Sequence, residues 1–152
     1  MPAAEYELRS PGPHDFDAWY ALYEPYAVLM GDPVTPAIGR TMWQWVMDPH
    51  NCVEAILAFS DRILVGFTHY RPFPRTLHGN DACYLDDLYV AGAHRGTGLA
   101  QRLIEAVAAV AKERGWSHVR WVTAEDNLRA QRLYNRIAER IDILTYQLKE
   151  TT

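Results

Sequence analysis

The sequence predicts a mixed α/β domain, in which helices flank a central sheet that is antiparallel at first and parallel later. Three observations predict it. Strand-like and helix-like stretches follow the order β-α-α-β-β-β-α-β-α-β. Consecutive strands with short connections pair antiparallel, whereas two strands joined through a long helix pair in parallel. The length of 152 residues suits one domain over 1–152.

The first third of the chain supplies one strand and two helices. Residues 5–9, "EYELR", alternate and precede the turn sequence "SPGP". A helix then begins near Asp15, and Pro25 and Gly31 disturb its end. Its apolar residues have helical spacing: Phe16, Trp19, Tyr20 and Tyr23. The next helix begins with Thr35 as its N-cap. Its apolar face holds Ile38, Met42, Trp45 and Val46.

The middle of the chain predicts three strands. Residues 53–59 and 63–70 are rich in β-branched and aromatic residues, and the short "SDR" between them indicates a hairpin. The prolines and the Gly-Asn-Asp sequence of 71–82 predict a loop. Residues 83–90, "CYLDDLYV", predict the third strand.

The last third predicts a helix, a strand, a helix and a final strand. The first of these helices ends near Gly115, a plausible C-cap. Its apolar face holds Leu99, Leu103, Val107, Val110 and Ala111. Strands are expected at 118–123 and 141–148, on either side of a helix at 127–137. The apolar residues of that helix are Ala130, Leu133, Tyr134 and Ile137.

Gly96 and Gly98 stand between the third of the middle strands and the long helix. Glycine lets the backbone approach a ligand closely, and a helix N-terminus presents unpaired N–H groups and a positive dipole end. The turn therefore suits a phosphate or pyrophosphate. Gln101 stands where a dinucleotide-binding fingerprint needs a third glycine, and a Gly-Lys-Ser/Thr sequence is absent. The alternative is that the two glycines only permit a tight turn.

Charge and cysteine content narrow the function class. A net charge of −4 argues against a nucleic-acid-binding protein, which needs a basic face. Cys52 and Cys83 match no metal motif, and the histidines show no ligand spacing, so we expect no metal. The first residues lack the basic start and apolar core of a secretory signal, and no apolar run reaches the length of a membrane span. We therefore expect a cytoplasmic protein with reduced cysteines and no membrane partner.

Two motifs together carry a family resemblance. The run "AHRGTG" at 93–98 and the run "TAEDNLRAQRLY" at 123–134 resemble the GNAT superfamily of acetyl-CoA-dependent N-acetyltransferases, as does the element order. The resemblance is close from Cys83 to Leu148. Ala93 departs from the Gln or Arg usual at its position, which removes one side-chain contact and leaves the backbone of the loop unaffected. The ending resembles the branch of histone, polyamine and diamine acetyltransferases.

The resemblance implies acetyl-CoA as co-substrate and places its contacts. Backbone N–H groups from Arg95 to Ala100 would bind the pyrophosphate. Leu88 to Val90 would pair with the pantetheine arm, and the Val90 N–H would polarise the thioester carbonyl. Asn127 would contact the pantetheine and Tyr134 would lie beside the sulfur. The implied cofactor-binding residues are Leu88, Tyr89, Val90, Arg95, Gly96, Thr97, Gly98, Leu99, Ala100, Asn127 and Tyr134.

Amide formation needs a neutral amine and a protonated leaving thiolate. The resemblance implies Tyr134 as the acid for the thiolate; the alternative is an ordinary core tyrosine. Asp86 and Asp87 would bind or deprotonate the amine, and as neighbours on a strand they should point to opposite faces. The alternative is one surface carboxylate and one paired with an arginine. His69 and His78 are weaker candidates for the base.

The resemblance also implies the substrate class. The acceptor is expected to be a primary amine: a small amine, a diamine or polyamine, or a lysine-like group, attacked in a ternary complex. Aromatic residues of the early helices would wall its site, or would pack in the core: Trp19, Tyr20, Tyr23, Trp43 and Trp45. Two other functions stay open, a non-catalytic CoA-binding sensor and a protein lysine or N-terminal acetyltransferase. The resemblance implies a homodimer.

Overall fold

The computed structural model describes residues 5–151, and the chain divides into two compact units. The first unit ends at Trp121 and the second begins at Val122. Residues 1–4, on which the expected lack of a secretory signal partly rests, lie outside the described residues, as does Thr152. Each unit is described by itself.

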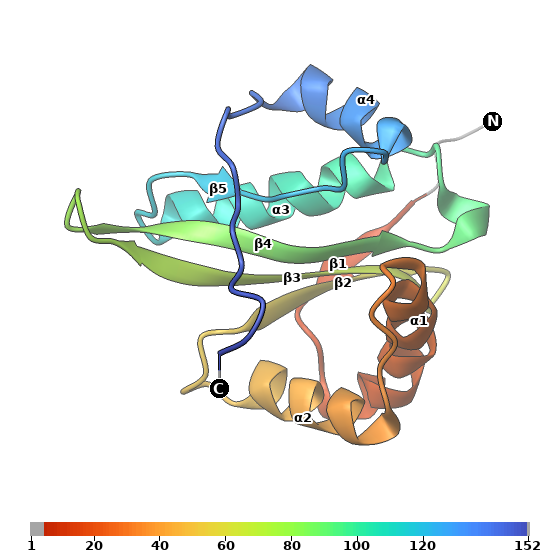
Figure 1. The fold of residues 1–152 in the computed structure, drawn as a ribbon. Helices are drawn as coiled ribbons and strands as arrows, with labels where there is room; N and C mark the ends of the chain where they lie inside the picture. The colour runs from red at the N-terminus through yellow and green to blue at the C-terminus, as the bar shows by residue number, and fades with distance from the viewer. Residues whose placement is uncertain (1–4, 152) are drawn as a thin grey trace. The chain divides into compact units, whose positions relative to one another are not determined.

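The first unit contains a five-stranded sheet in the order β1-β2-β3-β4-β5 (Figure 1). The strands are β1 (Glu7–Arg9), β2 (Glu54–Ser60), β3 (Ile63–Arg75), β4 (Asn80–Val90) and β5 (Val119–Arg120). The first four pair antiparallel, and β4 pairs with β5 in parallel. The mixed sheet expected from the sequence is therefore confirmed.

Helices cover both faces of this sheet (Figure 1). Two of them, α1 (Phe16–Leu29) and α2 (Pro36–Met47), lie on one face, which we call the α1 face. The opposite face, which we call the α3 face, carries α3 (Leu99–Glu113). Thr35 caps α2 as expected, because its side chain accepts a hydrogen bond from the Ile38 N–H.

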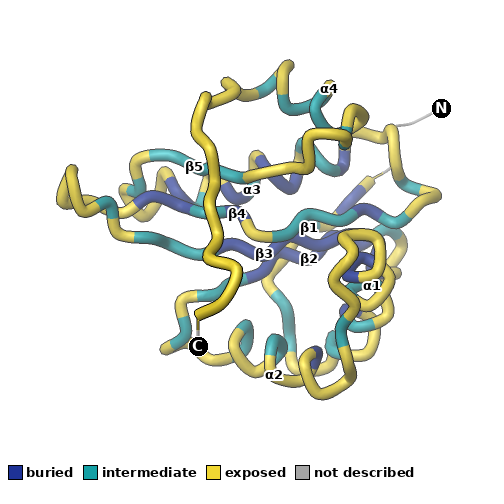
Figure 2. Tube along the Cα trace, in the orientation of Figure 1, coloured by how far each residue is buried: buried dark blue, intermediate teal, exposed yellow. Residues whose placement is uncertain are grey.

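The core lies where these helices meet the middle strands (Figure 2). Trp19 from α1 is fully buried with Leu57 and Phe67 on the α1 face. On the other face, α3 buries the residues that its periodicity predicts, apart from Val110, which is half-buried. α1 runs through Pro25 and ends at Leu29, just before Gly31, so of the two residues expected to disturb its end only Gly31 does so. The turn after Pro25 brings Tyr26 onto the buried face of the helix.

The expected loop at 71–82 is mostly strand, because β3 continues to Arg75 and β4 begins at Asn80. Pro72 and Pro74 pointed to a loop because proline cannot donate to a strand partner. β2 pairs with β3 only as far as Tyr70, so the positions of both prolines adjoin an edge that β2 does not cover. A missing N–H costs nothing there, and the prediction of a loop was wrong for this reason.

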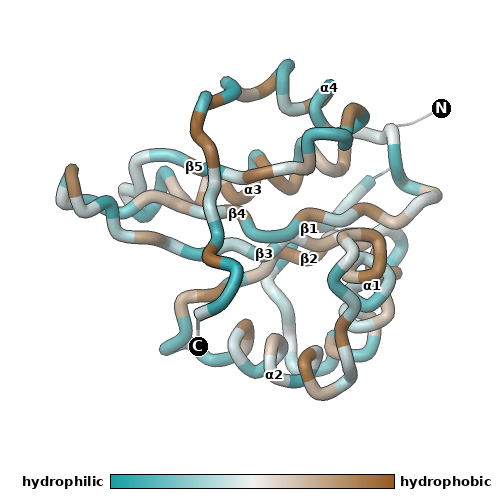
Figure 3. Tube along the Cα trace, in the orientation of Figure 1, coloured by the Kyte–Doolittle hydropathy of each residue, from teal (hydrophilic) through white to brown (hydrophobic). Residues whose placement is uncertain are grey.

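The expected strand at 141–148 does not form; after α4 (Leu128–Ile137) the described residues have no regular secondary structure. Alternating hydrophobicity predicts an amphipathic extended segment, but a strand also needs an edge to pair with. Large apolar side chains are exposed in this part of the second unit (Figures 2 and 3): Ile141, Ile143, Leu144, Tyr146 and Leu148. The strand at 118–123 forms over Val119–Arg120 alone.

The second unit contains the predicted helix of the second motif. α4 begins at Leu128, and Asn127 is its N-cap. The predicted apolar face of this helix is half-buried: Ala130, Leu133, Tyr134 and Ile137. Its other positions are exposed, apart from Gln131, which is also half-buried. Within the described chain, no helix has the length and apolar character required to cross a membrane.

Candidate active site

The glycine turn leaves the start of α3 open. Gly96 and Gly98 have φ values of +77° and +85°, in the left-handed region that favours glycine. Apart from the glycine itself and its chain neighbours, no atom of the described residues lies within 4 Å of where a Cβ would stand on either one. Gly98 is the N-cap of α3 and supplies no side-chain cap. The N–H groups of Leu99 and Ala100 have no acceptor within the helix, so an anion can receive them.

Contacts on the other side of the turn brace it. Tyr6 Oη lies 2.9 Å from His94 Nδ1 and donates to Thr97 Oγ1 at 3.2 Å. Thr97 Oγ1 in turn donates to the His94 carbonyl at 2.6 Å. The sequence did not suggest a role for Tyr6 or His94, because they lie 88 positions apart. The turn is held against the N-terminal strand through side chains and keeps its backbone open.

Arg95 folds back from the turn onto the end of β4. Its N–H donates to the Gly92 carbonyl at 3.3 Å, and its Nε donates to the Val90 carbonyl at 3.1 Å. Its guanidinium carbon lies 5.6 Å from the centre of the Tyr89 ring. The N–H groups available to an anion therefore begin at Gly96 rather than at Arg95.

The end of β4 has one unpaired edge in the first unit. β5 pairs with β4 at Cys83 and Tyr84. On the other edge, the Ala91 N–H donates to the Val65 carbonyl at 2.8 Å. Hydrogen-bonding direction alternates along a strand, so the N–H groups of Leu88 and Val90 point away from β3. Tyr89 is opposite Phe67, and its ring packs between Phe67 and Tyr26 on the α1 face.

Asp87 lies in a hydrogen-bond network on the α1 face. Trp19 Nε1 donates to His69 Nε2 at 3.0 Å. Because Nε2 accepts, Nδ1 carries the proton of the neutral ring and donates to Asp87 Oδ2 at 2.8 Å. Tyr26 Oη donates to Asp87 Oδ1 at 2.9 Å, and Thr68 Oγ1 donates to the Asp87 carbonyl. The network fixes the orientation of this carboxylate.

The network also sets the protonation of Asp87. Burial opposes ionisation, but the hydrogen bonds from His69 and Tyr26 outweigh it, and the pKa of Asp87 lies below its usual value. The Asp87 side chain is 27% exposed, so a ligand can reach it. His69 is fully buried and serves as the partner of Asp87. His78 lies exposed in the β3–β4 turn, where its N–H donates to Arg75.

Asp86 does not point to the face opposite Asp87, contrary to expectation. Asp87 is opposite His69 and Leu85 is opposite Tyr70, so Asp86 is the extra residue of a β-bulge. Asp86 pairs with Arg71 Nε at 3.0 Å. Arg71 stands two residues after His69 and therefore shares its face. The bulge brings both carboxylates to the α1 face. Burial raises the pKa of Asp86, and Arg71 only partly offsets this.

The aromatic residues of the early helices divide between core and surface. Trp19 is buried, and its ring stacks on Tyr23 with centroids 4.4 Å apart. Tyr20 and Trp43 are half-buried against the same cluster, whereas Trp45 is 48% exposed. Core packing, one of the two expectations, is therefore confirmed for Trp19.

Asn127 and Tyr134 belong to the second unit. Asn127 Oδ1 accepts a hydrogen bond from the Ala130 N–H at 3.3 Å and so caps α4. Tyr134 stands two helical turns further along, and burial raises the pKa of its phenol. A phenol with a raised pKa keeps its proton at neutral pH, as a proton donor must.

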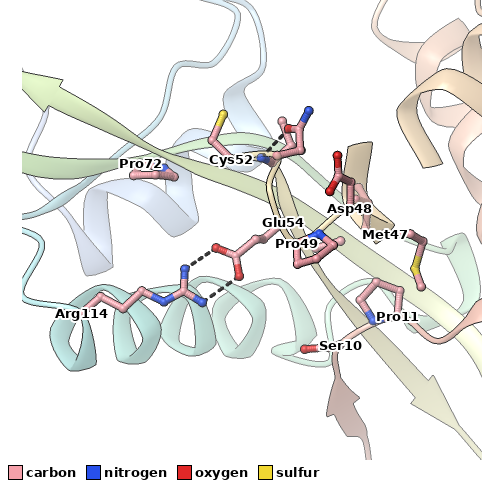
Figure 4. Close-up of a pocket in the computed structure, with 13 residues that line it drawn as sticks. Ser10, Pro11, Met47, Asp48, Pro49, Cys52, Glu54, Pro72 and Arg114 are labelled. Atoms are coloured by element: carbon pink, nitrogen blue, oxygen red, sulfur yellow. Dashed lines mark hydrogen bonds and ion pairs between the residues drawn. The ribbon is translucent and has the colours of Figure 1, made fainter. Parts of the chain in front are cut away.

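A separate hollow of about 540 Å³ lies between the end of α2 and the start of β2 (Figure 4). Glu54 and Arg114 form an ion pair at one side, and Cys52 lies at another. None of the residues predicted for the active site lines it. Across residues 5–151, no three histidine, cysteine or acidic side chains group as metal ligands would.

The model of the Acetyltransferase (GNAT) family matches residues 16–138. The chain belongs to this family. This GNAT chain is 33% identical over 137 residues to the D-amino-acid N-acetyltransferase HPA3 of Saccharomyces cerevisiae, a match that covers 89% of the chain and 85% of the relative. It is 39% identical over 54 residues to a thialysine N-epsilon-acetyltransferase of Bos taurus, over 36% of the chain and 32% of that protein. It is accordingly an acyl-CoA-dependent acyltransferase.

Solved structures share the GNAT fold. A ribosomal-protein-alanine N-acetyltransferase from Brucella melitensis biovar Abortus 2308 has a TM-score of 0.80 and 26% identity, covering 96% of this chain and 99% of that one. The aminoglycoside N-acetyltransferase AAC(6')-Iy in complex with CoA has a TM-score of 0.78 and 18% identity, covering 98% of each chain. The second likeness supports the fold alone.

Proposed function

We propose that the chain transfers an acetyl group from acetyl-CoA to a primary amine that attacks directly in a ternary complex. The observation that carries the proposal is the open start of α3 beside the unpaired end of β4. The turn can bind a pyrophosphate, and the adjoining edge of β4 has N–H groups that can pair with amides. Acetyl-CoA has both a pyrophosphate and an arm that carries amides. Acetyl-CoA supplies the acetyl group as a thioester.

The residues of the first unit fit this ligand in two ways. The N–H groups from Gly96 to Ala100 would hold the pyrophosphate, and Gly98 supplies the left-handed backbone from which the helix starts. Leu88 would pair with the pantetheine amides, and the Val90 N–H would donate to the thioester carbonyl oxygen, where negative charge develops. Asn127 would use the amide nitrogen that its capping role leaves available.

The reaction requires the removal of a proton from the amine and the supply of a proton to the leaving thiolate, and side chains would serve both steps. The amine arrives largely protonated, since an alkylamine has a pKa of about 10.4. Asp87 is ionised, oriented by His69 and partly exposed, so we assign it to bind the ammonium and to hold the water through which its proton leaves. Asp86 would assist on the same face. Tyr134 would hold the proton that the departing sulfur needs.

The relatives support an amine acceptor of low molecular weight. The two relatives described above are named for D-amino acids and for thialysine, and both compounds carry a primary amine. A protein N-terminus is the second candidate, favoured by the likeness to a ribosomal-protein-alanine N-acetyltransferase. A non-catalytic CoA sensor would bind acetyl-CoA without transfer.

The experiment mixes the protein and acetyl-CoA with diamines, polyamines, amino acids and N-terminal peptides, and follows release of free thiol. Transfer to at least one amine is expected; acetyl-CoA binding without any transfer would favour the sensor function. Tyr134→Phe should lower turnover while the Kd for CoA stays nearly unchanged. Unchanged turnover would remove Tyr134 from the acid role.

The domain organisation, the oligomeric state and the location are also proposals. We treat 1–152 as one acetyltransferase domain, since the family match crosses from the first unit into the second. A homodimer is supported by the exposed apolar side chains after α4, and light scattering after size-exclusion chromatography would test it. A cytoplasmic location agrees with the unpaired thiols of Cys52 and Cys83.

A further inference from the structure

The β-bulge sets an arginine beside the carboxylate that we assign to the amine. Arg71 and His69 share the α1 face, and Asp87 is opposite His69 on the neighbouring strand. Two residues along one strand span about 7 Å. Arg71 therefore stands about 7 Å along β3 from the residue that Asp87 is opposite, on the same face of the sheet.

Two neighbours hold the Arg71 guanidinium in place. Its Nε donates to both oxygens of Asp86, at 3.0 Å and 3.3 Å. Its central carbon lies 4.9 Å from the centre of the Tyr84 ring. The side chain is nevertheless 39% exposed. These contacts fix the guanidinium plane without covering it.

The terminal nitrogens of this guanidinium have no partner in the described part of the chain. Among residues 5–151, neither terminal nitrogen of Arg71 has a hydrogen-bond partner. Arginine binds a carboxylate most specifically through two parallel N–H donors, and its two terminal nitrogens form such a pair. The Nε contact with Asp86 leaves that pair without a hydrogen bond of its own to the described residues, on a side chain that is 39% exposed, so a ligand can reach it.

The charges around the two groups complement a zwitterion. Asp86 occupies only the Nε donor of Arg71 and leaves its other donors available. Asp87 receives its hydrogen bonds from the uncharged side chains of Tyr26 and His69, so its negative charge is not neutralised by them. An ammonium group fits Asp87 and a carboxylate fits the terminal nitrogens of Arg71. A diamine would place its second cation near Arg71, which disfavours it.

From this arrangement we infer that the acceptor is an amino acid, whose carboxylate binds the terminal nitrogens of Arg71 while its amine is directed to Asp87. The inference rests on the proposed acetyl transfer and adds a substrate class and a specificity-determining residue. Arg71 binds and positions the acceptor without taking part in proton transfer. Asp86 orients Arg71.

The test compares each amino acid with the amine that lacks only its carboxylate. D- and L-phenylalanine are compared with phenethylamine, and D- and L-lysine with 1,5-diaminopentane, by thiol release from acetyl-CoA. The wild-type protein should use at least one amino acid with a kcat/KM at least tenfold above that of its matched amine. Arg71→Gln should lower kcat/KM for that amino acid by about 10- to 100-fold, mainly through KM, since a hydrogen-bonded charge is lost.

Two control variants make the outcome specific. Arg71→Gln should lower kcat/KM for the matched amine far less than for the amino acid, since the amine has no carboxylate to lose, and Arg71→Lys should recover part of the loss. Arg75→Gln changes another arginine of β3, bonded to Asn80 and Ser117, and should leave both substrates unaffected. Circular dichroism confirms that each variant is folded.

The results separate this inference from the proposed function. Transfer to amines with no preference for amino acids would overturn the inference and leave acetyl transfer standing. An equal loss on amino acid and amine in Arg71→Gln would also overturn it, because Arg71 would then act on the fold or on the reaction in general. Transfer to neither class would overturn the proposed function and the inference together.

Discussion

The buried histidine gives the sharpest stability prediction. His69→Phe keeps an aromatic ring in the core but removes the acceptor for Trp19 and the donor for Asp87. The Trp19 N–H is then buried without a partner, which costs about 1–3 kcal/mol, and the bond lost to a charged carboxylate contributes about 1.5–3 kcal/mol. We expect the free energy of unfolding to fall by about 2.5–6 kcal/mol.

Urea denaturation followed by tryptophan fluorescence measures this change, and the midpoint of thermal unfolding should fall by about 5–24 °C for a chain of this size. Tyr26→Phe is the matched control, because it removes one hydroxyl bonded to the same carboxylate. It should cost about 1.5–3 kcal/mol. A loss below about 1 kcal/mol in His69→Phe would show that the network does not stabilise the fold, and the orientation assigned to Asp87 would fail with it.

Three further predictions concern the turn, the helix packing and pH. Gly98→Ala forces a left-handed φ on alanine, so Tm should fall by about 2–8 °C and calorimetry should show weaker CoA binding; Gly92→Ala, also in open space but without a positive φ, should change neither. Gly39→Ala places a Cβ against the Tyr20 ring. Urea denaturation should show a loss of about 1–3 kcal/mol despite alanine's better helix propensity, and a gain in stability would contradict the packing of α1 against α2. The pKa of Asp87 is lower in the folded protein than its unfolded value of about 3.9, so its ionisation stabilises the fold above that pH, and this stability is lost as pH falls through the folded pKa. The free energy of unfolding, measured by urea denaturation, should therefore decline below about pH 4, and Asp87→Asn should make this decline smaller.

Local signals predicted the helices and the turn well. Thr35 before Pro36 marks a helix start through a capping bond that needs only nearby residues. The glycines at Gly96 and Gly98 indicate left-handed backbone for the same reason. These features depend on residues close in the chain, so the sequence shows them directly.

The candidate site depends on longer-range pairing that local patterns do not contain. Alternation put Asp86 and Asp87 on opposite faces, but the register between β3 and β4 inserts a bulge at Asp86. The contact of Trp19 with His69 joins residues 50 positions apart. Such contacts depend on how α1 lies on the sheet, which composition and periodicity do not specify.

The two prolines of β3 have a consequence for assembly. The β3–β4 hairpin extends past the last residue of β3 that pairs with β2, and an exposed strand edge invites a strand from another molecule. Pro72 and Pro74 interrupt the row of N–H donors on that edge. A strand from another molecule would therefore lack a backbone donor at both positions. The hairpin can therefore extend beyond the sheet with protection against edge-to-edge aggregation built into its own backbone.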